Sequence, residues 1–137
     1  MEVEAMAYVD GYLLPVPKRN VAAYARMARV GAKVWMDHGA LDYKECVLQD
    51  ASTFCGMSFS KQLKLKNSET AVLAFVVFRS KKERDRVNAA VMKDPRIAAS
   101  MGPGHKMPFD ANRMVYSGFD VLVDGAPSAK RGRAKKG

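Results

Sequence analysis

The sequence predicts an α+β fold of the ferredoxin-like type, with two helices on one face of a four-stranded antiparallel sheet. Segments of strand-like alternation and of helical periodicity follow one another in the order β-α-β-β-α-β. Proline, glycine and helix-capping residues separate these segments. The length of 137 residues suits one domain, and the 48% hydrophobic and 27% charged residues are typical of a globular protein. We therefore expect a single domain over residues 1–125, followed by a basic tail over residues 126–137.

The first strand and the first helix are expected in the first third of the chain. Residues 7–14 alternate in the manner of a strand, and Pro15 and Pro17 are expected to end it. Apolar residues then recur every three or four positions over residues 18–38, with basic side chains mainly on the opposite side. Gly39 is a helix stop signal, so this amphipathic helix should end beside it.

A second strand and a long connection are expected next. Residues 41–48 alternate again, which places Tyr43 and Glu45 on the same face of the strand. Residues 49–70 show no clear period, apart from a short strand expected at residues 63–65. So long a connection in a small domain is typical of a lid or a partner-binding arm.

The C-terminal part of the chain contributes the second helix and the last strand. Ser80 and Glu83 match a capping box, in which the serine side chain accepts a hydrogen bond from the third amide of the helix. The helix should end before Pro95, which cannot continue it and which can start a short helical turn. After a long loop over residues 102–113, the last strand is expected at residues 114–123.

The third strand, residues 71–79, is apolar on both faces. Val76 and Phe78 lie on one face, and Phe75 and Val77 lie on the other. Because helices cover only one face of a ferredoxin-like sheet, the second set would remain an exposed apolar surface, which is typical of an interface. Burying each of these side chains contributes about 1.5–3 kcal/mol. We expect a second copy of the chain, a ligand or RNA to cover this face.

The first and last strands each have a face that mixes polar and apolar side chains. Tyr8, Asp10 and Tyr12 share one face of the first strand, and Tyr116 and Asp120 share one face of the last. We expect the purely apolar faces of these strands to meet the helices and the mixed faces to line the open surface. Polar groups on apolar walls are typical of a small-molecule site. Alternatively, the mixed faces fill the core of a dimer.

Two residues are candidates for acid–base chemistry. Asp10 is the first candidate for a base, because burial beside aromatic side chains can raise the pKa of a carboxyl. His38 is the second, although a histidine at the end of a helix commonly caps it. The candidate ligand-binding residues are the aromatic and charged side chains Tyr8, Trp35, Tyr43, Glu45, Phe59, Arg113 and Tyr116. We expect a pocket between sheet and helices that binds or transforms a small organic molecule.

An RNA-binding protein is the alternative, because RNA-recognition domains have the same topology. Residues 74–78 match the last five positions of their strand signature, whereas residues 71–73 fail the first three. Tyr8 and Phe75 could stack on bases, and a basic tail attracts nucleic acid. The small-molecule site is favoured, since any buried strand rich in valine and phenylalanine supplies such matches.

Charge and cysteine content narrow the class of protein further. The net charge is +9, and residues 126–137 contain five basic and no acidic residues, so we expect this tail to be a disordered arm. Cys46 and Cys55 have no histidine at ligand spacing, so no metal site is expected. No P-loop or G-x-G-x-x-G pattern occurs, and no cofactor is expected. No apolar run would span a membrane and no export signal precedes the first strand, which predicts a cytoplasmic protein.

Four stretches of sequence occur together in a recognisable order. They are YVDGYLLPVP at residues 8–17, WMDHGALDYKEC at 35–46, VNAAVMKDP at 87–95, and MPFDANRM at 107–114 followed by YSGF at 116–119. These stretches resemble the YbaA-like family of uncharacterised bacterial proteins, within the dimeric α+β barrel superfamily. The resemblance implies a homodimer whose two sheets pack face to face. The wider superfamily includes cofactor-free monooxygenases, haem-degrading enzymes, isomerases and ligand binders, and the resemblance implies no catalytic residues.

Overall fold

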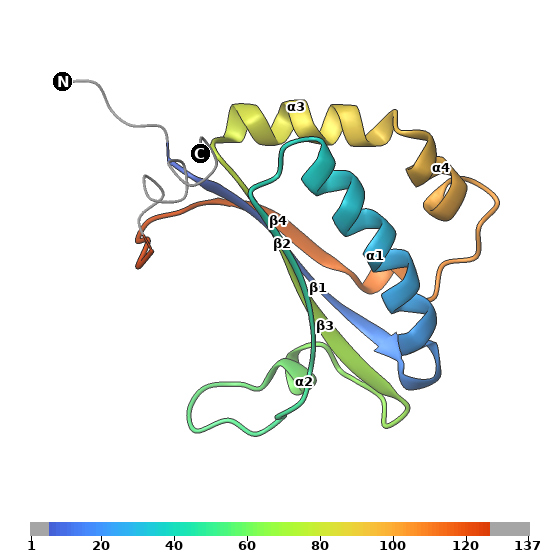
Figure 1. Ribbon diagram of the computed structural model, residues 1–137. Coiled ribbons are helices and arrows are strands. Elements are labelled where there is room, and N and C mark those ends of the chain that lie inside the picture. Colours follow the sequence, from blue (N-terminus) through green and yellow to red (C-terminus); the bar gives the residue numbers. More distant parts are fainter. Residues whose placement is uncertain (1–5, 127–137) are drawn as a thin grey trace.

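A four-stranded antiparallel sheet, with helices on one side, forms the centre of the protein (Figure 1). The computed structural model describes residues 6–126. The strands are β1 (Tyr8–Pro17), β2 (Asp42–Val47), β3 (Glu69–Phe78) and β4 (Val115–Asp120). They lie in the spatial order β2-β3-β1-β4, and each neighbouring pair is antiparallel. The predicted ferredoxin-like α+β fold is therefore confirmed.

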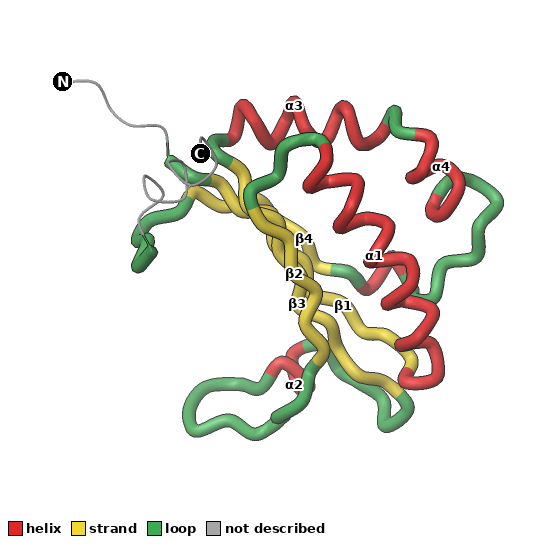
Figure 2. Tube along the Cα trace, in the orientation of Figure 1, coloured by secondary structure: helices red, strands yellow, loops and turns green. Residues whose placement is uncertain are grey.

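The helices divide between the two sides of the sheet (Figure 2). Three lie on one side: α1 (Val21–Asp37), α3 (Lys81–Met92) and α4 (Pro95–Met101). The short helix α2 (Phe59–Gln62) belongs to the connection that projects from the other side. Two 3-10 turns complete the structure: η1 (Lys18–Asn20) and η2 (Ala111–Arg113). As predicted, the Ser80 hydroxyl accepts a hydrogen bond from the Glu83 amide, 3.2 Å away, where α3 begins.

Strand β1 is longer than predicted, because it continues through Pro15 and Pro17. It pairs with β3 along its whole length but with β4 only as far as Leu13. Lys18, the next residue, donates its amide to Ser68 on the β3 side at 2.8 Å, so the nitrogens of the two prolines face the other way. A proline is tolerated where a strand has no partner to receive an amide hydrogen. Because the pairing with β4 ends at Leu13, Pro15 and Pro17 do not interrupt any hydrogen bond of the sheet.

Other parts of the sequence prediction also differ from the structure. Strand β3 begins at Glu69, before the predicted first residue, and β4 ends at Asp120 rather than Val123. The short strand predicted at residues 63–65 is wrong. Lys64 instead adopts a left-handed conformation with φ of 53° directly after α2, and this conformation cannot continue a strand.

The assignment of faces for β1 and β4 was also wrong. The mixed face of β1 meets the helices, where Tyr8, Asp10 and Leu14 are buried together with Val76 and Phe78 of β3. Paired residues of adjacent strands share a face, so the register between β1 and β3 decides which side chains turn inward. Polar side chains of α3 contact the polar groups of this face, so its mixed composition is compatible with burial.

The side of the sheet away from α1, α3 and α4 is called the open face here, and it is mainly apolar. Its side chains come from three strands: Val9, Leu13, Leu73, Phe75, Val77, Val115 and Phe119. Phe119 and Val115 are 57% and 56% exposed, respectively. The apolar surface that the sequence predicts therefore exists, although different side chains of β1 and β4 form it.

The core lies between the sheet and the helices in two clusters of apolar side chains. One cluster gathers under α3 around Val34, Phe78 and Val87. The other gathers under the first half of α1 around Leu14 and Tyr24. No helix within residues 6–126 is long and apolar enough to cross a membrane. The predicted basic tail lies, except for its first residue, outside the described residues.

Candidate functional site

A cavity of about 130 Å³ lies where the two core clusters meet, between α1 and the helix-facing side of the sheet. It is lined by Tyr12, Leu14, Tyr24, Met27, Ala28, Trp35, Tyr43, Glu45, Ala74, Val76, Met101, Met107, Phe109 and Met114. The segment between α4 and β4 contributes Met107, Phe109 and Met114. Asn20 attaches this segment to the start of α1 by donating to the Pro108 carbonyl at 3.0 Å.

Glu45 is the charged residue of the cavity lining. The alternation of β2 places Tyr43 and Glu45 on the helix-facing side of the sheet. One carboxylate oxygen of Glu45 accepts a hydrogen bond from the Tyr24 hydroxyl, and the other accepts one from the Tyr43 hydroxyl, both at 2.7 Å. Burial and the nearby Glu45 raise the pKa of both tyrosines well above its usual range. Both hydroxyls therefore keep their protons and act as donors.

Aromatic rings from several elements surround this carboxylate. The rings of Trp35 and Tyr43 lie 6.0 Å apart at an angle of 44°, and those of Tyr24 and Phe109 lie 5.7 Å apart at 67°. Tyr12 also lines the cavity. The cavity therefore combines several aromatic surfaces in different orientations with a single carboxylate.

A second group of polar side chains, called the Asp10 cluster here, lies between β1, β4 and α3. It consists of Tyr8, Asp10, Arg84, Asn88 and Tyr116. Arg84 donates hydrogen bonds to the hydroxyls of Tyr116 and Tyr8, at 3.0 and 3.3 Å, and lies 4.9 Å above the centre of the Tyr8 ring. The cluster therefore contains three of the residues that the sequence singled out.

Asp10 is fully buried in this cluster. One of its carboxyl oxygens lies 3.5 Å from an Arg84 nitrogen, and the other lies 3.5 Å from the Asn88 amide nitrogen. Burial raises the pKa of Asp10 above its usual value, and the positive charge of Arg84 only partly opposes this effect. Asp10 thus has the raised pKa expected of a candidate base.

The Asp10 cluster contacts the cavity at two points, but Asp10 itself does not line the cavity. Asn88 accepts a hydrogen bond from the Trp35 indole at 3.0 Å, and Tyr12 stacks on Tyr116 with 4.8 Å between ring centres. The geometry allows the cluster to position Trp35 and Tyr12. In the part of the chain that the structure describes, no group of three or more His, Cys, Asp and Glu side chains is placed to hold a metal ion.

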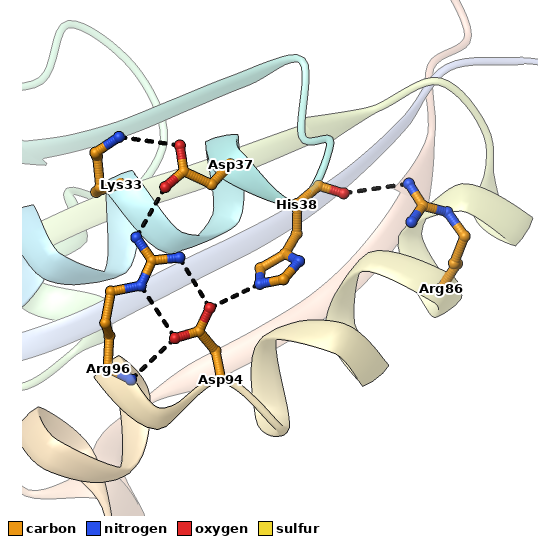
Figure 3. A network of polar contacts seen from close by, with 6 residues as sticks. All are labelled: Lys33, Asp37, His38, Arg86, Asp94 and Arg96. Carbon is orange, nitrogen blue, oxygen red and sulfur yellow. Dashed lines mark hydrogen bonds and ion pairs between the residues drawn. The ribbon is translucent and has the colours of Figure 1, made fainter.

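His38 lies outside the cavity, in a network of ion pairs at the end of α1 (Figure 3). Its imidazole is 2.8 Å from Asp94, which also pairs with Arg96 at 2.8 Å. Arg96 in turn pairs with Asp37, and the His38 carbonyl accepts from Arg86 at 3.2 Å. This network joins the end of α1 to the start of α4. The geometry therefore assigns His38 a connecting role and places it apart from the candidate ligand site.

Arg113 and Phe59 also lie apart from the cavity. Arg113 pairs with Glu69 and donates to two backbone carbonyls after α2, at 3.0 and 3.2 Å. It therefore holds η2 against the start of β3. Phe59 lies on α2 beside Leu13 and Leu73, at one end of the open face. Of the predicted ligand-binding residues, the cavity brings together Trp35, Tyr43 and Glu45.

Sequence reasoning missed three residues that define these groups. Tyr24 belongs to the apolar stripe of α1, so nothing in its position separates it from ordinary core residues. Arg84 and Asn88 lie four positions apart on α3, alternating with buried Val87 and Val91. Polar residues within the buried stripe of a helix were the signal that could have identified them.

A comparison with known proteins identifies the family. Residues 7–111 match a family described as "Protein of unknown function (DUF1428)". The chain belongs to this family. DUF1428 relatives include the proteins named "Uncharacterized protein YbaA" of Escherichia coli (strain K12) and of Shigella flexneri. Each is 35% identical over 119 residues, which are 87% of this chain and 99% of the relative. The resemblance to YbaA-like proteins is thereby confirmed.

A solved structure shows the same fold at low sequence identity. It is the crystal structure of a nipsnap family protein with unknown function from Agrobacterium tumefaciens str. C58. The two structures match with a TM-score of 0.52 and 14% identity, over 88% of this chain and 91% of that chain. The similarity supports the α+β fold of this DUF1428 protein and carries no statement about its activity.

Proposed function

We propose that this DUF1428 protein binds a small organic molecule, about the size of one aromatic ring, in the cavity between α1 and the sheet. The observation that carries this proposal is a cavity of about 130 Å³ with apolar walls and one carboxylate. An engineered apolar cavity of about 150 Å³ holds benzene, so the volume suits a single ring. Few polar groups on largely apolar walls are typical of ligand sites.

The energetic cost of the cavity supports the same proposal. Space left unfilled beside a packed core forfeits van der Waals contacts, so the cavity is destabilising. A core selected only for stability would fill such a space, because larger side chains at positions such as Ala28 and Ala74 would occupy it. A ligand would offset the cost by restoring the lost contacts.

Trp35 provides a direct test, because it lines the cavity and is the single tryptophan of the chain. Toluene and benzyl alcohol should change the fluorescence of Trp35 in a saturable manner. Ala28→Leu should fill the cavity and abolish the change, because Ala28 lies in the lining. Ala22→Leu is the matched control, since Ala22 is an exposed residue of the same helix. Saturable binding that survives in Ala28→Leu would contradict the proposal, as would a wild-type protein that binds no single-ring molecule, neutral or charged.

We also propose that the open face of the sheet pairs with the open face of a second copy. Its exposed apolar side chains on β3 and β4 support this, since such a surface is typical of an interface. The charged side chains of β2 on this face, Asp42 and Lys44, pair with each other at 3.1 Å. Among the strand residues of this face, the cation Lys44 is thus already paired, so the face is poorly suited to phosphate groups, which favours a second copy over RNA. Tyr8 and Phe75, the two residues expected to stack on bases, lie on opposite faces of the sheet.

A further inference from the structure

We propose that the molecule bound in the cavity is an organic cation, either a small protonated amine or a quaternary ammonium ion. This inference rests on the proposed binding function and specifies the charge of the ligand. Its basis is the combination of an unpaired carboxylate, a ring of aromatic side chains and unused hydrogen-bond acceptors at one site.

The first observation is that no cation among the described residues neutralises Glu45. Both of its oxygens accept hydrogen bonds from neutral hydroxyls, and within residues 6–126 it forms no ion pair. Asp50, Asp110 and Asp120 also form no ion pair within these residues, but all three are exposed, whereas Glu45 is half-buried and lines the cavity. A charge on the edge of an apolar cavity interacts strongly with a ligand, because little water screens it. This site therefore attracts a positive ligand and repels a negative one.

The second observation is the aromatic lining. The cavity is surrounded by the rings of Tyr12, Tyr24, Trp35, Tyr43 and Phe109. The faces of aromatic rings attract cations, with tryptophan the strongest, and groups of such rings recognise quaternary ammonium ions. A neutral ring would also fit against these walls, but it would gain no charge–charge attraction from the carboxylate.

The third observation concerns hydrogen-bond acceptors. Each oxygen of Glu45 uses one acceptor position for a tyrosine and retains a second. The hydroxyl of Tyr12 makes no hydrogen bond to another described residue, and burial raises its pKa well above the usual range, so it keeps its proton. Its oxygen is thus a further acceptor. An ammonium group is donor-only, with up to three hydrogens, and these acceptors match it.

The test uses ligands that share a ring and differ in charge: benzylammonium, benzyl alcohol and benzoate. Binding is measured at pH 7 by Trp35 fluorescence and by calorimetry on the full-length protein. Benzylammonium should bind about tenfold more tightly than benzyl alcohol, and benzoate should bind more weakly than either. Tetramethylammonium against tert-butanol repeats the comparison with compact ligands, in case the benzyl group exceeds the cavity.

Three variants separate charge from shape. Glu45→Gln should reduce the preference for the cation to about twofold or less, while the affinity for benzyl alcohol changes little. Asp42→Asn removes the same charge from the open side of the same strand and should keep the wild-type preference. Tyr24→Phe frees one carboxylate oxygen and should preserve or strengthen cation binding. Circular dichroism establishes that each variant is folded.

The possible outcomes distinguish this inference from the function on which it rests. If neutral ligands bind and the cations bind equally or more weakly, the inference is wrong while the binding function stands. A cation preference that persists in Glu45→Gln would also overturn it. If neither neutral nor cationic ligands bind the wild-type protein, the binding function itself fails.

Discussion

At the scale of single residues, Asp10 shows how pairing and burial compete. Arg84 supplies a positive charge 3.5 Å away, yet the full burial of Asp10 outweighs it and the pKa of the carboxyl is raised. A buried ion pair of this kind gives little net stability, because both charges lose their hydration. Its main effect here is positional, since Arg84 also holds the hydroxyls of Tyr8 and Tyr116.

Asp10→Asn should alter how the stability of the protein depends on pH. The pKa of the Asp10 carboxyl is raised in the folded state above its unfolded-state value near 4. Below pH 4 the protonated carboxyl makes its full contribution to stability. That contribution is lost as the pH rises and the buried carboxyl ionises, whereas asparagine stays neutral. For each pH unit by which the folded-state pKa exceeds the unfolded-state pKa, the free energy of unfolding changes by about 1.4 kcal/mol. Urea unfolding between pH 3 and pH 8 measures the difference between wild type and variant, with Asp42→Asn as the control. A pH-independent difference for Asp10→Asn would contradict this account.

Gly118→Ala should destabilise the protein, although alanine normally stabilises a strand relative to glycine. A Cβ atom at position 118 would collide with the Tyr8 hydroxyl, and Tyr8 is buried against Arg84. We expect a loss of about 1–3 kcal/mol, typical of overpacking. Ser117→Ala, on the opposite face of the same strand, should change the free energy of unfolding by less than about 0.5 kcal/mol. Equal effects of the two substitutions would refute the proposed collision.

At the scale of secondary-structure elements, the network around Asp94 determines how α4 follows α3. The Asp94 side chain caps α4 by accepting from the Arg96 amide at 2.9 Å, and it also pairs with His38 at the end of α1. One side chain therefore fixes the junction of three helices (Figure 3). Met101 of α4 lines the cavity, so this junction also positions part of the candidate site.

Asp94→Asn and Asp94→Ala should separate the cap from the ion pairs. Asparagine retains a capping oxygen, so it should lower the melting temperature less than alanine does. Arg96 and His38 hold the pKa of Asp94 well below its usual range, so its ionised form stabilises the fold above pH 4, and that contribution is lost as the pH falls. The difference in melting temperature between wild type and Asp94→Asn should shrink on acidification from pH 6 to pH 3. A difference that grows on acidification would be inconsistent with these ion pairs.

The sequence was sufficient to predict the four strands and the main helices, but not the faces of the outer strands. Local patterns, such as the two-sided apolar strand and the Ser80 cap, depend on neighbouring residues and can be read directly. Which face of β1 turns inward depends on its register with β3, where Tyr8 pairs with Phe78. The polar groups that accompany this face come from α3, far along the chain. Their effect on β1 could not be predicted from the alternation of β1 alone.

The candidate site was predictable only in part, for a related reason. Trp35, Tyr43 and Glu45 belong to segments that are adjacent in sequence, and the structure places all three at the cavity. His38 and Arg113 carry suitable chemistry, but both are engaged by partners distant in sequence, Asp94 and Glu69 respectively. Residue type indicates what a side chain can do, whereas the tertiary structure decides which partner it meets.

At the scale of the whole molecule, the two faces of the sheet divide the proposed roles. The helix-facing side encloses the cavity, and the open face presents the apolar surface proposed to pair with a second copy. The connection over residues 48–68, which contains α2 and projects beside the open face, contributes Phe54 and Met57 as further exposed apolar residues. Such residues at the edge of the proposed interface would be partly covered by the second copy.

Phe119→Asp should dissociate the proposed dimer. Phe119 is exposed on the open face, and a buried carboxylate at this position would be costly in an apolar interface. Sedimentation velocity at micromolar concentration should give a dimer for the wild-type protein and a monomer for the variant. Met92→Asp, an exposed position on α3, should remain a dimer.

Two results would count against pairing of the open faces. One is a wild-type protein that sediments as a monomer. The other is salt-dependent binding of single-stranded RNA that Phe119→Asp abolishes, which would favour the alternative of an RNA-binding surface.

Four methionines among the residues that line the cavity make the site sensitive to oxidants. They are Met27, Met101, Met107 and Met114. Oxidation to the sulfoxide adds an oxygen atom and converts an apolar wall into a polar one. In a space of about 130 Å³ this change should abolish ligand binding, and treatment with methionine sulfoxide reductases should restore it. Titration with peroxide tests this prediction, with peptide mass spectrometry to measure the oxidation of each methionine and Trp35 fluorescence to measure ligand binding. Binding that persists after all four sulfurs are oxidised would place the ligand elsewhere.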